Sequence, residues 1–149
     1  MSEHQATIQW KRESPDFEYE TYNRSHQWSF DSGVEVPASA APGYQGDLDR
    51  VDPEEALVAA LSSCHMLTFL ALSAKKKFVV EEYTDEAVGY LEKNDKGKLS
   101  ITRAILRPKV RFADSASPSE AELAQLHERA HEHCFIANSV RTSITVEPQ

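Results

Sequence analysis

The chain has 149 residues, a common size for one domain, and its 40% hydrophobic and 27% charged residues are typical of a globular protein. The formal net charge of −8 argues against nucleic acid or an anionic membrane surface as a partner, because both bind clustered Lys and Arg. The first nine residues are polar and lack an apolar signal segment, and the most apolar run, residues 56–74, is interrupted by polar side chains. We therefore expect a cytoplasmic protein whose two cysteines form no permanent structural disulfide.

The N-terminal third has the alternating pattern of half-buried strands. Apolar and polar residues alternate over residues 6–10, again over 17–21, and again over 26–36. The last stretch contains Asp31-Ser32-Gly33, which predicts a hairpin with Gly33 at a position of positive φ. Residues 37–50 are rich in Pro, Gly, Ser and Ala and are predicted to form a loop.

A long helix is predicted to begin at Asp52. The Asp52 side chain can cap free N–H groups, Pro53 suits the first helical position, and Glu55 stands at the capping-box position. Apolar residues then recur at three- and four-residue steps through residues 57–71, and much of the opposite side is apolar too. A helix that is apolar nearly all round is usually buried, so we expect it to be the central helix of the fold, ending near Lys75.

The remainder of the chain predicts a hairpin, a helix and a strand. Residues 78–93 and 98–112 alternate around a turn that contains Gly97. Residues 117–120 combine cap residues with Pro and precede an amphipathic pattern carried by Leu123, Leu126 and Ala130, and residues 143–146 read as a short strand. Because strands and helices do not alternate regularly, the predicted fold class is α+β, built as a single domain over residues 1–149.

The two cysteines are the first candidates for chemistry. Cys64 lies in the middle of the long helix, where a free cysteine is most often a buried structural thiol. A reactive role requires a thiolate beside a cation, with access for a small oxidant. Cys134 lies near the end of the last predicted helix, and the two sulfurs can form a bond only if their Cα atoms come within about 7 Å.

Other candidates have ordinary explanations when they are taken singly. His127 and His131 share a helix face, and with His65, His133 and Cys134 they offer ligand types for zinc, although no fixed zinc motif is matched. Histidines at a helix end are more often solvated. Arg24, in a polar loop, reads as a surface arginine, and Glu54 as a first-turn carboxylate that stabilises the helix dipole.

Together, however, Arg24, Glu54, Cys64 and Cys134 resemble the pattern of the OsmC/Ohr family. In that family Asn/Asp-Pro-Glu opens a long helix, and the peroxidatic cysteine follows the Glu at the spacing that separates Glu54 from Cys64. Residues 24–33 resemble the family's N-terminal loop, in which an Arg precedes a Ser-rich strand and a turn. Cys134 stands where the family keeps its second cysteine.

The resemblance implies an intertwined α+β homodimer with each active site at the subunit interface. It also implies a Cys-based cycle that reduces organic hydroperoxides or hydrogen peroxide. The sequence departs from the family where Tyr22-Asn23 replaces a Gly-rich stretch, where His65 follows the first cysteine, and where Phe135 follows the second. These differences indicate a distinct subfamily.

The mechanism implied by the resemblance has a physical basis. A thiol with an ordinary pKa of about 8.5 is only a few per cent thiolate at neutral pH. Arg24, held by a bidentate pair with Glu54, would favour the thiolate of Cys64. The thiolate would attack peroxide and become a sulfenic acid, Cys134 would condense with it, and an external thiol or dithiol would reduce the disulfide. This cycle needs no metal, flavin or haem.

Two alternatives belong to other classes of function. The first is an OsmC-like binding protein without peroxidase turnover, which a large separation of Cys64, Cys134 and Arg24 would favour. The second is a zinc-dependent enzyme that uses the C-terminal histidine cluster, which metal analysis of the purified protein would test.

Overall fold

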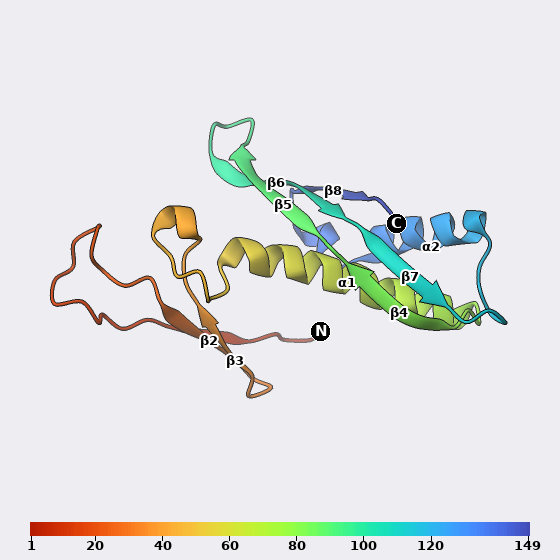
Figure 1. Ribbon diagram of the computed structural model, residues 1–149, viewed down its shortest axis with the longest axis horizontal. Helices are drawn as coiled ribbons and strands as arrows, with labels where there is room; N and C mark the ends of the chain where they lie inside the picture. Colours follow the sequence, from red (N-terminus) through yellow and green to blue (C-terminus); the bar gives the residue numbers. More distant parts are fainter. The chain divides into compact units, whose positions relative to one another are not determined.

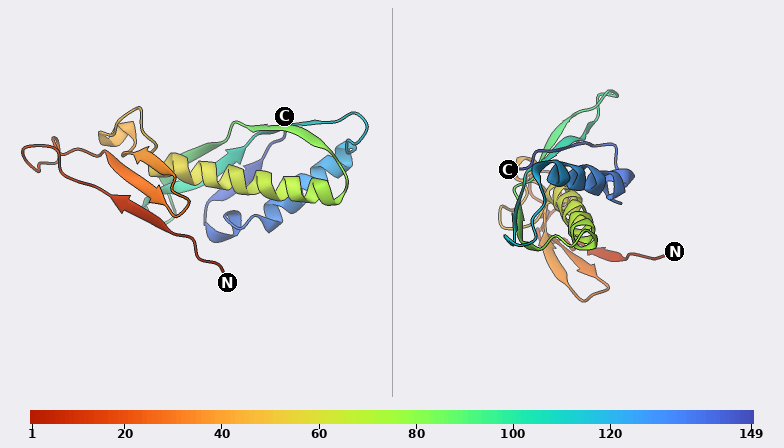
Figure 2. Two further views of the ribbon diagram at one scale, coloured as in Figure 1. Left: turned by 90° about the horizontal axis from the view of Figure 1, so that it is seen from below. Right: turned by 90° about the vertical axis from the view of Figure 1, so that its right-hand side faces the viewer.

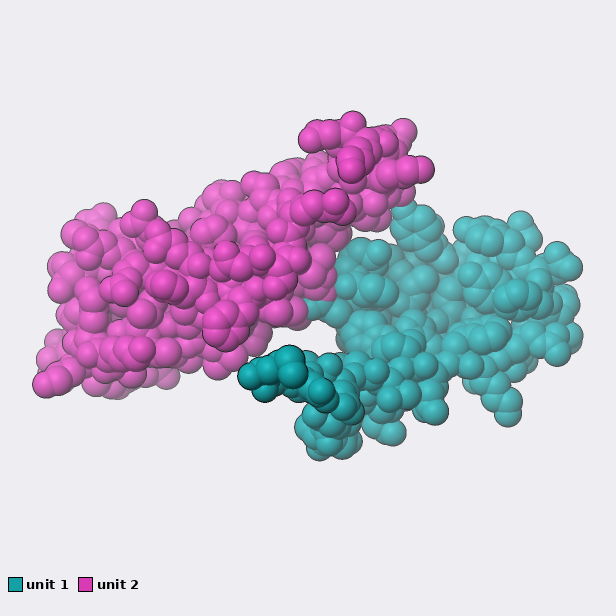
Figure 3. Space-filling model, turned by 180° about the vertical axis from the view of Figure 1, so that it is seen from behind, with its two compact units in different colours: residues 1–56 teal, residues 57–149 magenta.

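The computed structural model describes all residues from Met1 to Gln149. Its contacts group into two compact units, residues 1–56 and 57–149 (Figure 3). The first four residues of the long helix belong to the first unit and the rest to the second.

The first unit contains a three-stranded antiparallel sheet in the order β1-β2-β3, formed by Ala6–Gln9, His26–Phe30 and Glu35–Ala38. The predicted hairpin between β2 and β3 is confirmed, with Gly33 at a φ of +82°. A short 3-10 helix, η1 (Pro42–Tyr44), lies in the predicted loop.

The predicted strand over residues 17–21 is wrong. The N–H groups of Thr21 and Tyr22 donate to the carbonyl of Glu18 at 3.1 and 3.0 Å, which closes a turn there. The alternating aromatic residues instead form a small cluster, in which the ring of Phe17 lies 5.8 Å from that of Trp10 and 5.2 Å from that of Tyr22. The alternation therefore reflects aromatic packing within a loop and not pairing in a sheet.

Helix α1 (Pro53–Lys75) begins as predicted, with a capping box. The Glu55 N–H donates to the Asp52 carboxylate at 2.8 Å, and the Asp52 N–H donates to the Glu55 carboxylate at 3.3 Å. Lys77, with a φ of +64°, terminates the helix beyond its last turn.

The expectation that α1 is buried all round is not met within one chain. Its buried residues recur every four positions and so form a single narrow face of the helix: Leu61, His65, Phe69 and Ser73. The helix is long and apolar enough to cross a membrane by length and composition, with a mean hydropathy of 1.7 over its most apolar window. The core helix of a soluble protein can have the same length and composition. Unlike a helix buried on all sides, α1 has apolar side chains, such as Leu67, that its own chain leaves exposed.

The second unit contains the predicted long hairpin, with Gly97 at a φ of +71° in its turn (Figure 1). Its arms divide between two sheets. One sheet pairs β4 (Val80–Asp85) with β7 (Pro108–Phe112), and the other has the order β5-β6-β8, formed by Val88–Lys93, Leu99–Leu106 and the predicted strand Ser143–Val146.

The division has a local cause. Pro108 has no N–H to continue the ladder, and the Arg107 N–H donates to the Asp85 carboxylate at 2.6 Å instead of to a strand carbonyl. Strand β8 then adds to the free edge of β6 in parallel, which the sequence does not indicate.

Helix α2 (Glu120–His133) begins at Ser119, whose side chain forms a capping box with Glu122. Figure 2 shows α1 and α2 together on one face of the strands of the second unit. The core there is formed by Phe69, Leu126 and Ala130, against which β4 and β7 also pack. This packing places the middle of α1 beside α2 and its C-terminal end.

Candidate active site

Cys64 lies on α1, half-buried, on a face that looks into an open groove of about 700 Å³. The groove is formed by the outer face of α1, the last turns of α2 and the segment that follows α2. Its walls are mainly apolar, with Leu67 and Phe135 left 60% and 83% exposed. The thiol is therefore accessible from a surface suited to an apolar ligand.

Cys134 caps the C-terminal end of α2 and is 1% exposed. Its N–H donates to the carbonyl of His131 at 3.3 Å, and its sulfur accepts from the N–H of Ala137 at 3.4 Å. The side-chain amide of Asn138 donates to its carbonyl at 2.9 Å. These contacts fix Cys134 in a tight turn that leads into η2 (Ala137–Ser139).

The fold brings the two thiols together. Burial, and after it the side-chain hydrogen bond that links Cys134 to Cys64, raises the pKa of Cys134 to about 11. Cys134 is therefore a protonated thiol at neutral pH, enclosed by protein, while Cys64 beside it opens to the groove. The two cysteines therefore differ in both accessibility and readiness to ionise.

Basic residues line part of the groove that holds Cys64. Lys75 ends α1, and Arg129 and His133 lie on the last turns of α2. The lining therefore combines basic and apolar side chains. A ligand with an apolar body and a polar or anionic end fits this distribution.

Arg24 lies in the first unit, and its guanidinium contacts residues of its own loop. It donates to the carbonyl of Tyr22 at 2.5 Å and to the carbonyl of Tyr19, and it stands over the Tyr22 ring, 3.7 Å from the centroid. The predicted bidentate pair with Glu54 is not formed within this chain. Two carbonyls of the tight turn at residues 18–22, those of Tyr19 and Tyr22, accept hydrogen bonds from the guanidinium instead.

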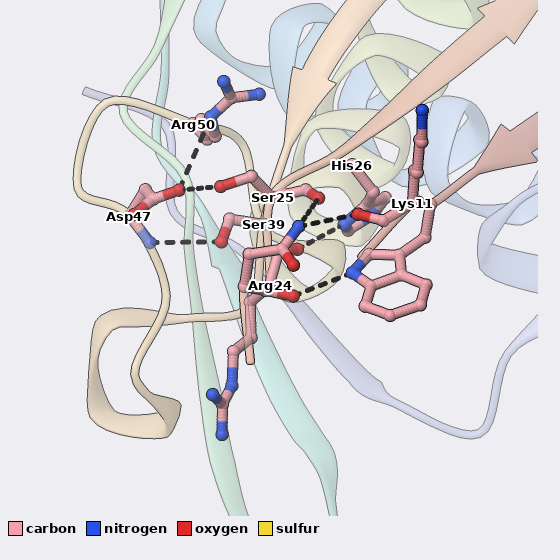
Figure 4. Close-up of polar contacts among 9 residues, drawn as sticks. Lys11, Arg24, Ser25, His26, Ser39, Asp47 and Arg50 are labelled. Atoms are coloured by element: carbon pink, nitrogen blue, oxygen red, sulfur yellow. Dashed lines mark hydrogen bonds and ion pairs between the residues drawn. The ribbon is translucent and has the colours of Figure 1, made fainter. Parts of the chain in front are cut away.

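The backbone around Arg24 is firmly held, as Figure 4 shows. The His26 ring contacts the Arg24 carbonyl at 2.8 Å, and the Ser25 hydroxyl donates to Asp47. Asp47 in turn contacts Ser39 through its N–H at 3.1 Å and Arg50 through its carboxylate at 3.5 Å. The Arg24 side chain extends away from these contacts, so they fix the backbone of Arg24 and not its guanidinium.

Glu54 occupies the first turn of α1, where its charge suits the positive end of the helix dipole. Pro53, the residue before it, lines a shallow pocket of about 390 Å³ that Arg24 also lines. The structure thus gathers the Arg24 loop and the start of α1 in the first unit, and the two thiols in the second.

The histidines differ from expectation. His127 is buried, although a solvated position was predicted, because α2 turns it onto Phe69, with ring centroids 4.4 Å apart. Its Nδ1 lies 3.1 Å from Nε2 of His65, which is also buried. No three His, Cys, Asp or Glu side chains gather as a metal would require. Sequence reasoning missed this pair, because helix periodicity places each histidine on a face without saying which faces meet.

The family model for OsmC-like proteins matches residues 45–149. The chain belongs to the OsmC-like family. The matched segment contains Glu54, Cys64 and Cys134, and Arg24 lies outside it.

Among solved structures, an OsmC-like protein of unknown function from Vibrio cholerae is 50% identical over all of both chains, with a TM-score of 0.97. An organic hydroperoxide resistance protein from Elizabethkingia anophelis, 20% identical over 99% of this chain and 94% of its own, has a TM-score of 0.73 and shares the fold. The uncharacterised protein YmaD of Bacillus subtilis is 24% identical over 84% of each chain.

Proposed function

We propose that this OsmC-like protein is a thiol peroxidase that reduces organic hydroperoxides, or hydrogen peroxide, through Cys64 and Cys134. The proposal rests on one observation: an accessible thiol in an apolar groove stands beside a buried thiol that stays protonated at neutral pH. Some structural neighbours carry the name of organic hydroperoxide resistance proteins, which agrees with this chemistry.

In the proposed cycle, the thiolate of Cys64 attacks one peroxide oxygen, and the O–O bond breaks. The thiolate sulfur is oxidised to a sulfenic acid, and the peroxide leaves as an alcohol, or as water from hydrogen peroxide, after taking up a proton. The Cys134 sulfur then bonds to the Cys64 sulfur, and the hydroxyl of the sulfenic acid leaves as water with the Cys134 proton. Two equivalents of an external thiol, or one dithiol, reduce the disulfide. The cycle uses no metal, flavin or haem.

The groove favours an organic substrate over hydrogen peroxide. Its apolar walls, including Leu67 and Ala71, would gain free energy by covering a hydrocarbon chain, at about 25 cal/mol per Å² of apolar surface removed from water. Hydrogen peroxide offers no such surface, so the advantage of an organic hydroperoxide should appear mainly in the concentration dependence of the reaction.

A second copy of the chain is the proposed partner. The apolar face of α1 that its own chain leaves open, which includes Leu67, is a suitable surface for a homodimer, together with the exposed Phe135 that follows α2. We propose that dimer formation completes the site by bringing Arg24 and Glu54 to Cys64, with the Arg24 side chain released from its loop carbonyls. A cytoplasmic location suits a cycle that depends on thiol reductants.

The test is peroxide consumption by the purified protein with cumene hydroperoxide or hydrogen peroxide, and with dithiothreitol or glutathione as reductant. Cys64→Ser is expected to abolish turnover. Cys134→Ser is expected to complete the first turnover and to accumulate a sulfenic acid that dimedone labels at Cys64. Equal peroxide consumption by Cys64→Ser and the unaltered protein would refute the proposal.

One observation favours a second function, an OsmC-like binding protein without turnover. The Arg24 guanidinium donates to two carbonyls of its own loop and lies over the Tyr22 ring. If that arrangement persists in the dimer, Cys64 lacks its directing cation. Tight binding of an apolar ligand in the groove without peroxide consumption would then identify this function.

A further inference from the structure

A buried imidazole pair joins the two helices that carry the thiols. His65 of α1 is 1% exposed and His127 of α2 is 4% exposed. Their nitrogens lie 3.1 Å apart, and their rings are nearly parallel, with 3° between the planes. Such a hydrogen bond needs an N–H on one ring and a lone pair on the other. Burial lowers the pKa of both residues to about 4, so both are neutral at physiological pH.

The pair is poorly suited to stability alone. The outer nitrogens, Nδ1 of His65 and Nε2 of His127, have no hydrogen-bond partner, and neither have the buried hydroxyls of Ser73 and Tyr83. An unpaired buried polar group costs about 1–3 kcal/mol, so two leucines would fill this space at lower cost. The hydrogen bond between the histidines is directional and permits only one alignment of α1 against α2. An apolar contact in its place would let the two helices slide along each other.

The alignment bears on the thiols. His65 directly follows Cys64 on α1, and successive helical side chains diverge by about 100°. One residue can therefore face α2 while the other opens to the groove. His127 and Cys134 are two turns apart, about 10 Å along the axis of α2, and so lie on a similar side of it. Fixing His65 against His127 thus fixes Cys64 against the end of α2.

A contact between α1 and strand β4 also helps to fix the position of α1. The Ser62 hydroxyl donates to the Asp85 carboxylate at 2.5 Å, which anchors α1 to β4. The charged and titratable groups that act on the pair are His131 from α2 and Asp85 from β4, with the Tyr83 hydroxyl on β4 near Asp85. His131 disfavours a charge on His65 and Asp85 favours it, and burial outweighs both.

We propose that the His65–His127 hydrogen bond is a positioning element that holds Cys64 and Cys134 within reach of each other, so that their disulfide forms readily. The proposal deepens the proposed function, in which this disulfide is an intermediate. It concerns the resolving step, in which the Cys64–Cys134 bond forms and water leaves. The first attack of the Cys64 thiolate on peroxide does not require this hydrogen bond.

The test measures the disulfide itself and needs no peroxidase turnover. The equilibrium between the Cys64–Cys134 disulfide and the dithiol is measured in glutathione buffers at pH 7.5. The proteins are the unaltered chain, the apolar double variant His65→Leu/His127→Leu and, as a matched control, Ser73→Ala, which removes another unpartnered buried group from the same face of α1. Circular dichroism and thermal unfolding establish that each variant is folded.

The expected result is a fall of at least tenfold in the equilibrium constant for disulfide formation in the double variant, with its thermal stability retained or increased. Ser73→Ala is expected to match the unaltered protein. His127→Gln, which keeps a donor and an acceptor, is expected to recover part of the loss. His127→Leu, which removes one imidazole and with it the hydrogen bond, serves as the second variant if the double variant fails to fold, and the same fall is expected of it. An unchanged equilibrium constant in a folded variant without the imidazole hydrogen bond, or no disulfide in the unaltered protein, would overturn the proposal.

Peroxide kinetics then separate the two ideas. If the double variant reacts with one equivalent of cumene hydroperoxide as fast as the unaltered protein, and its sulfenic acid lives at least tenfold longer, both proposals stand. If no variant consumes peroxide but the glutathione equilibrium shifts as expected, the positioning role stands and the peroxidase function fails.

Discussion

Cys134 ends α2 beside Cys64 of α1, and burial together with the hydrogen bond between the two thiols raises the pKa of Cys134 to about 11. The residue is also 1% exposed, so two separate causes protect it from electrophiles. Cys64, half-buried on an open groove, has no such cover. The two thiols should therefore differ in reactivity although they are neighbours.

Alkylation should reveal this difference. At pH 7.5, iodoacetamide is expected to modify Cys64 at least tenfold faster than Cys134, because only the thiolate is nucleophilic and Cys134 stays protonated and covered. Peptide mass spectrometry over time measures both rates in one sample. A control in denaturant should show similar rates. Faster modification of Cys134 in the folded protein would reverse the assignment of the two roles.

Stability should fall in mild acid because of the imidazole pair. The folded-state pKa of His65 and of His127 is about 4, against an ordinary 6.5 in the unfolded chain. Between these values the unfolded chain binds more protons, so the free energy of unfolding decreases as the pH falls from 6.5 toward 4. At pH 5 the loss should be on the order of 2 kcal/mol per imidazole.

Urea unfolding at pH 7.5 and pH 5.0 measures this loss. The double variant His65→Leu/His127→Leu should lose much less stability over the same interval, because it has no buried imidazole to charge. Ser73→Ala should keep the pH dependence of the unaltered protein, since it removes no titratable group. A double variant as acid-sensitive as the unaltered protein would assign the effect to other residues.

Local signals in the sequence predicted much of this fold. Gly33 and Gly97 marked the two hairpin turns, and Asp52 with Glu55 marked the start of α1, because each of these depends on a few neighbouring residues. The division of the long hairpin at Pro108 and the parallel pairing of β8 were not predictable, because both depend on contacts between distant segments.

The candidate site shows the same limit. Helix periodicity could place Cys64 on a face of α1, but not its hydrogen bond to Cys134. It also gave no reason to bury His127, since a histidine near a helix end is usually solvated. The contact of His127 with Phe69 and His65 arises only when α2 packs on α1. The role of Arg24 was suggested by family resemblance alone, and its loop contacts could not be foreseen.

Arg24 and Glu54 supply a third prediction. If dimer formation directs the Arg24 guanidinium to Cys64, Arg24→Ala should slow sulfenic acid formation by about ten- to a thousandfold, since a neighbouring charge shifts protonation equilibria by one to three powers of ten. Glu54→Gln should have a smaller effect because it acts by orienting Arg24. The double variant should resemble Arg24→Ala, as expected of groups that act as a unit.

Stopped-flow measurement with one equivalent of cumene hydroperoxide, in the Cys134→Ser background, isolates this first step. Arg12→Ala is the matched control, because Arg12 is another arginine of the first unit and donates to the carbonyl of Pro15 at 3.1 Å. It should leave the rate unchanged. If Arg24→Ala behaves like Arg12→Ala, the Arg24 guanidinium has only contacts within its own loop.

The fourth prediction concerns the uncovered face of α1. Leu67 is 60% exposed on the groove beside Cys64, and covering such a side chain by a second copy would contribute about 1.5–3 kcal/mol. Leu67→Asp should therefore weaken the dimer at least tenfold, because it removes this gain and adds an unpaired charge to the interface. Light scattering across a dilution series measures the dissociation constant. Leu99→Asp is the matched control, since Leu99 is 55% exposed on β6 and lies outside the groove, so its dimer should be unchanged. A monomer at micromolar concentration in the unaltered protein, or equal weakening by both variants, would show that this face of α1 is not the dimer interface.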